Sequence, residues 1–355
     1  MDLTVLVFLL SGLALGWALG ANDAANIFGT AVGTGMVRFT TAAIVASVFV
    51  ILGAVISGAG ASHTLGKLGA INALPGAFMA ALSAAITVYW MTKRGLSVST
   101  SQAIVGAIVG WNIFSGKPTD SETLTIILLT WVACPVIAGF IAVPLFLSTR
   151  YIVSNAKLHL IRLDAYTRFA LIAAGAFGAY SLGANNISNV MGVFVSSSPF
   201  TDFSIDTMMG DSYVFTSIQQ LFLLGAIAIA VGIFTYSKKV MMTVGQDIVS
   251  LSPISAWVVV TAHSIVLFLF TSQGLENFLN GNSLPTIPLV PVSSSQAVIG
   301  AIVGIGVFTG STNIRWRVLG SIGVGWVLTP FIACLVCILG LYFLQNIFNQ
   351  VTFLP

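Results

Sequence analysis

The sequence predicts an all-α polytopic membrane protein that consists of two inverted-topology repeats with broken helices and re-entrant helical hairpins. Three observations lead to this prediction. Of the 355 residues, 57% are hydrophobic and only 6% are charged, whereas a soluble domain carries about 25% charged residues. Apolar runs recur along the whole chain and approach the roughly 20 residues that span a bilayer as a helix. Finally, a set of polar motifs occurs twice in the same order.

Composition and motifs also exclude several classes of protein. The net charge of +3 is too small for the basic surface of a nucleic-acid-binding protein. The sequence has no Gly-x-Ser-x-Gly, Walker A or His-Glu-x-x-His motif, and these motifs mark hydrolases, nucleotide-binding proteins and zinc proteases. We therefore expect no enzyme, no nucleic-acid partner and no cofactor other than ions. The expected location is the inner or plasma membrane of the cell, as a multi-pass protein surrounded by lipid.

The first apolar run, residues 1–19, could be read as a signal peptide. It lacks the basic region with which such peptides begin, because Asp2 is its only charged residue, and the apolar pattern continues beyond Gly20. We therefore interpret this run as the first membrane helix.

The internal repeat is clearest in two Ser-rich segments. VSTSQAIVGAIVGWNIF (98–114) and VSSSQAVIGAIVGIGVF (292–308) are identical at 11 of 17 positions. An Asn-rich motif precedes each of them, GANDAANIFG from Gly20 and GANNISNVMG from Gly183. Duplication at this scale indicates a repeated structural unit. We expect a first repeat at 1–150, a cytoplasmic linker at 151–165 and a second repeat at 166–355.

Loop charges indicate that the two repeats have opposite orientations in the membrane. Lys93 and Arg94 precede the first Ser-rich motif, whereas only Glu276 precedes the second. Arg38 follows the first Asn-rich motif, whereas Asp202 follows its copy. Because Lys and Arg near helix ends stay in the cytoplasm, equivalent loops should lie on opposite sides. We expect five crossings in each repeat, with both termini outside. Such inverted repeats are typical of secondary transporters, which bind their substrates near the membrane midplane.

The first Asn-rich motif places Asn22, Asp23 and Asn26 directly after an apolar span. A charge at the bilayer centre costs at least about 3 kcal/mol, so such residues usually have a function. A helix N-cap would explain one polar residue, but neither three of them nor their repetition as Asn185, Asn186 and Asn189. We also expect the helices to break at Gly20 and Gly183, because a break at membrane depth is tolerated around a cavity.

The Ser-rich motifs each begin a helix rich in Gly and Ala. A helix N-terminus presents free N–H groups and a partial positive charge, which favour an anion. Any single Ser or Thr there is equally well explained as an N-cap. Two such ends, one from each repeat, could face one tetrahedral oxyanion. We assign the anion contacts to Asn26, Thr100, Ser101, Gln102, Asn189, Ser294, Ser295 and Gln296.

No Lys or Arg lies within these motifs, so a bound anion needs another counter-charge. Carboxylate, amide and hydroxyl oxygens are hard ligands that suit an alkali cation such as Na⁺, as in other transporters with inverted repeats. A proton relay would use buried His, Glu or Lys, and the motifs offer only Asp23. We therefore expect Na⁺ as the coupling ion, held by Asn22, Asp23, Ser99, Asn185, Asn186 and Ser293.

These motifs resemble those of the inorganic phosphate transporter (PiT) family. The resemblance rests on GANDAANIFGTAVG, its copy GANNISNVMG, and the pair VSTSQAIVG and VSSSQAVIG, and it covers nearly the whole chain. It implies coupled uptake of phosphate with Na⁺ or H⁺ on an inverted-repeat fold. The Asp that the family usually carries in its second repeat is Asn186 here. The family's Thr-His pair is Ser101-Gln102 in one repeat and Ser295-Gln296 in the other, which further weakens a proton mechanism.

The function predicted from the sequence is therefore Na⁺-coupled symport of inorganic phosphate by alternating access. An H⁺-coupled permease for phosphate or sulfate is the first alternative, and an anion channel is a weaker one. An intramembrane enzyme is disfavoured by the missing nucleophile motifs. The GAIVG segments at 106–110 and 300–304 permit close helix packing, either within one chain or in a homodimer.

Overall fold

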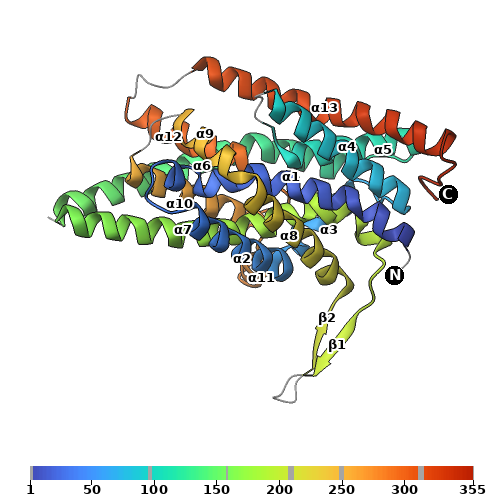
Figure 1. The fold of residues 1–355 in the computed structure, drawn as a ribbon, viewed down its shortest axis with the longest axis horizontal. Coiled ribbons are helices and arrows are strands. Elements are labelled where there is room, and N and C mark those ends of the chain that lie inside the picture. Colours follow the sequence, from blue (N-terminus) through green and yellow to red (C-terminus); the bar gives the residue numbers. More distant parts are fainter. Residues whose placement is uncertain are drawn as a thin grey trace.

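Long helices run side by side along one axis of the molecule (Figure 1). The computed structural model describes residues 3–94, 98–156, 159–206, 212–247, 252–310 and 316–354. The first half contains α1 (Leu3–Gly33), α2 (Phe39–Ser57), α3 (Ala59–Leu68), α4 (Leu74–Lys93), α5 (Thr100–Ser115) and α6 (Ser121–Asn155). The second half contains α7 (Leu160–Met191), the 3-10 helix η1 (Gly192–Ser197), β1 (Phe203–Asp206), β2 (Ser212–Phe215), α8 (Ser217–Thr235), α9 (Ser237–Asp247), α10 (Pro253–Leu269), α11 (Gln273–Gly281), α12 (Ser294–Phe308) and α13 (Trp316–Asn346).

The helices confirm an integral, multi-pass membrane protein. In the described part of the chain, six helices are long and apolar enough to cross a bilayer: α1, α2, α4, α6, α8 and α13. A seventh span results if α10 and α11, which meet at a 64° bend, are counted together. This is fewer than the ten crossings expected. The helices α5 and α12 have only 16 and 15 residues, and α7, although 32 residues long, is less apolar than the six helices counted as spans.

The expected helix breaks at Gly20 and Gly183 are wrong. Helix α1 continues through Gly20 and α7 through Gly183. Both glycines instead allow a neighbouring helix to approach closely. A Cβ atom on Gly20 would lie 2.0 Å from the carbonyl oxygen of Ile229 on α8, and one on Gly183 would lie 2.1 Å from that of Val50 on α2. Small residues permit such contacts between membrane helices, so the glycines serve packing.

The two ends of the bundle differ in what they contain. The last turn of α6 and the first turn of α7 lie at one end of the long axis, and the two chain termini lie at the other (Figure 1). Hydrogen bonds hold the C-terminal segment at this end. Trp111 Nε1 donates to the Thr352 carbonyl at 3.0 Å, and Lys117 Nζ and Asn72 Nδ2 donate to the Leu354 carbonyl at 3.1 and 3.0 Å. This arrangement agrees with the expectation that both termini share one side.

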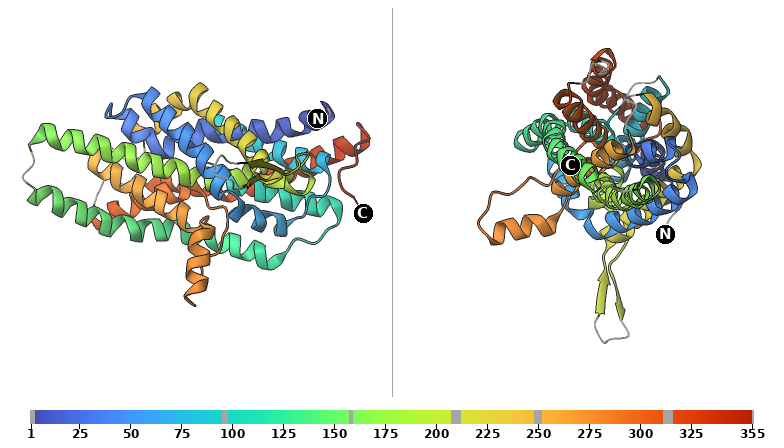
Figure 2. Two further views of the ribbon diagram at one scale, coloured as in Figure 1. Left: turned by 90° about the horizontal axis from the view of Figure 1, so that it is seen from below. Right: turned by 90° about the vertical axis from the view of Figure 1, so that its left-hand side faces the viewer.

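Two segments project sideways from the bundle. The antiparallel hairpin of β1 and β2, in which Phe203 pairs with Phe215, extends away from the helices, and so does the short helix α11 (Figures 1 and 2). The hairpin was not expected from the sequence. It lies in one of the two loops that make the second half longer than the first.

Candidate functional site

The two Asn-rich motifs lie within the long helices α1 and α7. Asp23 is 5% exposed, and Asn185, Asn186 and Asn189 are at most 1% exposed. Amides and carboxylates buried to this degree are costly unless they are hydrogen-bonded or bind a ligand. Helices α1 and α7 contact each other, and each of them also contacts one of the helices that begin with a Ser-rich motif.

The Ser-rich motifs form the N-termini of α5 and α12, as expected. Ser99 and Ser293 are the N-caps, and their side chains accept hydrogen bonds from the backbone N–H groups of Gln102 and Gln296, each at 3.4 Å. The N-cap interpretation is thus correct for these two serines. Capping accounts for one hydroxyl in each motif. The remaining hydroxyls of the two motifs do not cap a helix.

The two helix starts reach across to each other. Ser101 Oγ on α5 donates to the Val292 carbonyl just before α12 at 3.0 Å, and Ser295 Oγ on α12 donates to the Val98 carbonyl just before α5 at 3.4 Å. Segments about 190 residues apart in the sequence therefore meet, and they do so in a reciprocal way. The expectation that the two Ser-rich ends face one another is met by this geometry.

One buried crevice lies between these ends and the Asn-rich helices. It is lined by Asp23 and Asn186, together with Val98, Ser99, Thr100, Ser101, Ser293, Ser294 and Ser295. The crevice therefore combines a carboxylate, an amide and six hydroxyls from four separate helices. Its interior has no room for a water-sized sphere, so an anion can enter only if the hydroxyl-bearing ends move apart.

Amides of the Asn-rich motifs connect the helices around this crevice. Asn26 Nδ2 donates to Ser294 Oγ, and Asn189 Nδ2 donates to Ser101 Oγ, each at 2.9 Å. Asn185 pairs with the backbone of Val292: its Nδ2 donates to the carbonyl at 2.8 Å, and its Oδ1 accepts from the N–H at 2.9 Å. All four motifs therefore belong to one hydrogen-bonded cluster.

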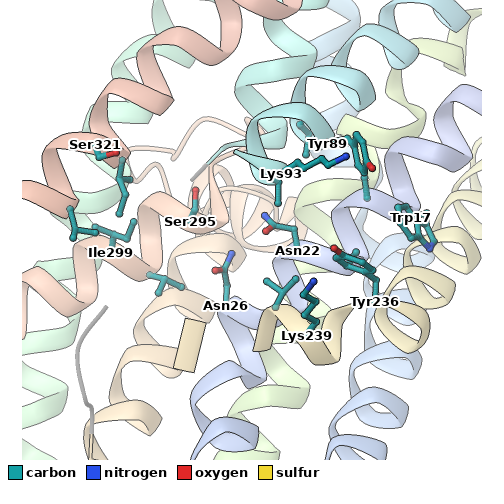
Figure 3. A pocket seen from close by; sticks show the side chains of 18 of the residues that line it. Trp17, Asn22, Asn26, Tyr89, Lys93, Tyr236, Lys239, Ser295, Ile299 and Ser321 are labelled. Carbon is teal, nitrogen blue, oxygen red and sulfur yellow. The ribbon is translucent and has the colours of Figure 1, made fainter. Parts of the chain in front are cut away.

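The two Asn-rich motifs differ in their access to solvent. Asn22 and Asn26 are partly exposed and line a pocket of about 880 Å³, whereas Asn185 and Asn189 are fully buried. Figure 3 shows Asn22, Asn26 and Ser295 facing this pocket, with Lys93 and Lys239 at its margin. Arg317 contributes a third basic side chain to the lining. The pocket and the crevice share Ser295 in their linings, so the basic side chains of the pocket lie on the same side of the crevice as this hydroxyl.

Several buried polar atoms of the cluster have no hydrogen-bond partner among the described residues. They are Thr100 Oγ1, Gln102 Oε1, Asn186 Nδ2, Asn189 Oδ1 and Gln296 Oε1. Unsatisfied buried polar atoms are rare in native proteins, and a missing ligand is one explanation for them. Gln102 and Gln296 are buried next to the crevice-lining hydroxyls in the sequence, but they are not among the residues that line the crevice.

The electrostatics of the crevice favour a bound cation. Asp23 accepts a hydrogen bond from Asn22 Nδ2 at 3.0 Å, and no Lys or Arg forms an ion pair with it in the described part of the chain. A buried carboxylate without a counter-charge is strongly unfavourable. Groups of three or more His, Cys, Asp or Glu do not occur among the described residues. The donor set of carboxylate, amide and hydroxyl oxygens therefore suits a hard cation and disfavours a transition metal.

Sequence reasoning missed two features of this site. His263 on α10 is fully buried, and its Nε2 lies 2.9 Å from Ser294 Oγ. Only its position in an apolar segment could have drawn attention to it. Lys93, Lys239 and Arg317 line one pocket, and their convergence there depends on the packing of α4, α9 and α13.

Comparisons with known proteins identify relatives of this chain. The sequence pattern of the Phosphate transporter family matches residues 19–337 and, in a second match, residues 279–352. An archaeal protein named "Putative phosphate permease", from Methanocaldococcus jannaschii, is 26% identical over 94% of this chain and 96% of its own. The sulfate permease CysP of Bacillus subtilis is 27% identical over 94% of this chain and 85% of its own.

A solved structure shares the fold. It is titled a sodium-dependent phosphate transporter, and it superimposes with a TM-score of 0.73 over 97% of this chain and all of its own. The sequence identity between the two is 22%. This likeness supports the arrangement of the helices. Which residues bind which ion has to be argued from the side chains of this chain itself.

Proposed function

The chain belongs to the phosphate transporter family, and on this premise we propose that it is a secondary active transporter that carries inorganic phosphate together with Na⁺. The observation that carries the proposal is the crevice where Asp23 meets the Ser-rich starts of α5 and α12. One buried site there combines donors for an anion with oxygen ligands for a cation. Membership of a transporter family also excludes the enzyme alternative.

The anion is proposed to bind between the two helix starts. Thr100 Oγ1 and Asn186 Nδ2 are buried donors without a partner among the described residues. Ser101 and Ser295 donate to backbone carbonyls of the opposite motif, and both hydroxyls become available when the two ends separate. Hydroxyls, an amide and helix N-termini supply the donors that a tetrahedral oxyanion accepts. The basic residues Lys93, Lys239 and Arg317 of the pocket would attract the anion electrostatically.

Na⁺ is proposed to bind at Asp23 with neighbouring amide and hydroxyl oxygens of the first-half motifs. A cation there would neutralise the buried carboxylate and would also offset the charge of the anion. The second-half equivalent, Asn186, is neutral, and its Oδ1 already accepts hydrogen bonds from Asn185 and Asn189. Of the four motifs, only the first Asn-rich motif supplies a charged ligand for the cation.

Reciprocal helix contacts support an inverted repeat formed by residues 1–150 and 166–355. Gly20 of α1 packs on α8, and its counterpart Gly183 of α7 packs on α2. In the same way Gly106 of α5 contacts Pro330 of α13, and Gly300 of α12 contacts Pro135 of α6. Exchange of partners between equivalent elements is the pattern that a two-fold axis between the halves would produce.

The unequal exposure of the two Asn-rich motifs supports alternating access. In the second half, Asn185 is buried and pairs with the backbone of Val292. Its equivalent in the first half, Asn22, lines the open pocket. Inverted-repeat transporters alternate between two such arrangements. Lys93, Lys239 and Arg317 line the open side, and because basic residues near helix ends stay in the cytoplasm, we propose that this pocket opens to the cytoplasm.

Transport measurements in proteoliposomes test the proposal. We expect uptake of ³²P-phosphate to follow an inward Na⁺ gradient and to continue when the proton gradient is collapsed. Counterflow of labelled phosphate against an unlabelled internal pool should occur, as expected of a carrier. Uptake driven by protons alone would replace Na⁺ by H⁺ as the coupling ion, and conduction without counterflow would indicate a channel.

Sulfate is the second candidate substrate, because the chain is also similar to a sulfate permease. Competition in the same assay separates the two anions. Phosphate is the substrate if a large excess of sulfate leaves the uptake of labelled phosphate unchanged. Labelled sulfate that accumulates faster than phosphate under the same Na⁺ gradient would contradict the assignment of phosphate.

Thr100→Val tests the anion site with little risk to the fold. The hydroxyl of Thr100 has no partner among the described residues, so its removal should leave the stability nearly unchanged. We expect phosphate affinity to fall by roughly 10- to 100-fold, since a hydrogen bond to a charged group contributes about 1.5–3 kcal/mol. Equilibrium binding of labelled phosphate to the purified protein measures the effect.

Thr87→Val is the matched control for this variant. Thr87 is also buried, but its hydroxyl donates to the Ser83 carbonyl at 2.7 Å within α4. The control should lose some stability and keep its phosphate affinity. Equal phosphate affinity in the Thr100→Val protein and the wild type would remove Thr100 from the anion site.

A further inference from the structure

His263 stands out as a buried, hydrogen-bonding side chain that the proposed site leaves without a role. It lies on α10, is fully buried, and reaches Ser294 with its Nε2 at 2.9 Å from Oγ. Ser294 lines the crevice and also accepts a hydrogen bond from Asn26 Nδ2 at 2.9 Å. Two side chains from different helices therefore converge on one hydroxyl of the anion site.

The hydrogen-bonding capacity of Ser294 limits what its hydroxyl can do. A hydroxyl has one hydrogen to donate and two lone pairs to accept with. Asn26 occupies one lone pair. If His263 Nε2 carries a hydrogen, it occupies the second lone pair and the Ser294 hydrogen is free for another acceptor. If Nε2 is bare, Ser294 must donate its hydrogen to His263 and has none left for an anion.

The surroundings of the other ring nitrogen favour the first arrangement. His263 Nδ1 is buried and has no hydrogen-bond partner among the described residues. A neutral imidazole has one N–H and one bare nitrogen. A buried N–H without an acceptor is rarer in proteins than a buried acceptor that is left unused. The hydrogen therefore belongs on Nε2, where it has a partner, and Nδ1 is the bare nitrogen.

We propose that His263 is a positioning residue, whose Nε2–H holds the Ser294 oxygen so that the Ser294 hydroxyl donates its hydrogen to the bound tetrahedral anion. The proposal rests on the anion site described above and assigns a residue that acts on it through another side chain. Asn26 and His263 together fill both lone pairs of Ser294. The direction of its hydroxyl is thus fixed before the anion arrives, and the anion need not reorient it.

A double-mutant cycle with inorganic phosphate as the probe tests this role. In the wild-type background, His263→Leu should weaken phosphate binding by about tenfold or more, the effect of one hydrogen bond to a charged ligand. In a Ser294→Ala background the same change should have no further effect, because the hydroxyl that it orients is gone. An equal loss in both backgrounds would overturn the proposal.

The variant His263→Gln distinguishes orientation from simple packing. The Gln side chain can place an N–H near the position of Nε2, so it should restore most of the phosphate affinity that Leu loses. If Leu prevents folding, His263→Gln and Ser294→Ala still decide the question by themselves. A folded Gln protein with a loss as large as that of Ser294→Ala would contradict the proposal. His63→Gln, at an exposed position on α3, is the control and should bind like the wild type.

The outcome for the wild-type protein separates this inference from the proposed function. The cycle is measured with phosphate and repeated with sulfate, both at saturating Na⁺. If wild type binds neither anion, both the transport function and the role of His263 are rejected. If wild type binds one of them and the cycle is additive, the transport function stands and only the role of His263 is rejected.

Discussion

Asp23→Asn is expected to abolish Na⁺-stimulated phosphate uptake. The substitution keeps the shape of the side chain and the oxygen that accepts from Asn22 Nδ2, but it removes the carboxylate of the crevice. A site for the anion alone would bind phosphate more tightly once a repelling charge is gone. A coupled site should do the opposite, because the cation that neutralises phosphate is lost with the carboxylate.

The expected size of the effect follows from the coupling between the two ions. Coupling free energies between sites are typically about 1–3 kcal/mol, a factor of roughly 5 to 150 in affinity. Phosphate affinity at high Na⁺ should fall in the Asp23→Asn protein by a factor in this range. Asp164→Asn is the matched control, since Asp164 is exposed and pairs with Arg168 near the start of α7. It should transport like the wild type, and tighter phosphate binding by Asp23→Asn would contradict the coupling role.

Gly183→Ala is expected to destabilise the folded protein severely. Its Cβ atom would lie 2.1 Å from the Val50 carbonyl oxygen, and a backbone atom cannot rotate away as a side chain can. Helices α7 and α2 must therefore separate, at a cost we expect to exceed about 3 kcal/mol, the upper range for overpacked cores. The apparent melting temperature of the purified protein and its elution as a single species measure the loss.

Gly320→Ala on α13 is the control for this substitution. A Cβ there meets no atom within 4 Å, and Ala is favoured over Gly in a helix by about 1 kcal/mol. The control should therefore be as stable as the wild type or slightly more stable. The same behaviour in Gly183→Ala would mean that Gly183 does not serve close packing.

The sequence predicted the membrane class for physical reasons that act locally, and it predicted the family through the resemblance of its motifs. Charged side chains are unfavourable in the hydrocarbon of a bilayer, so the long apolar runs indicated the membrane-spanning helices. The few polar motifs within these runs indicated candidate functional residues, because burying polar groups there costs free energy. Ser99 and Ser293, which we assigned to Na⁺, cap their helices, as the alternative explanation for a single hydroxyl of these motifs had it. The comparisons confirm the resemblance to phosphate transporters.

What the sequence could not predict depends on contacts between distant segments. We expected a helix break at Gly20 because the conformational freedom of glycine is known from the residue type alone. Its close contact with Ile229 on α8 depends on how the helices pack, which the sequence does not reveal. His263 is a single residue in an apolar helix, and only the packing of α10 beside Ser294 gives it a role. Gln102 and Gln296 share the motifs with the hydroxyls but are not among the residues that line the crevice.

The most direct test of the central claim, that Na⁺ and phosphate share the crevice at Asp23, is equilibrium phosphate binding to the wild-type protein as a function of Na⁺ concentration. A large organic cation replaces Na⁺ so that the ionic strength stays constant, and a buffer holds the pH constant. Phosphate affinity should rise with Na⁺, and Na⁺ affinity should rise with phosphate by the same factor, as linkage requires. Phosphate affinity that is independent of Na⁺ would contradict the claim.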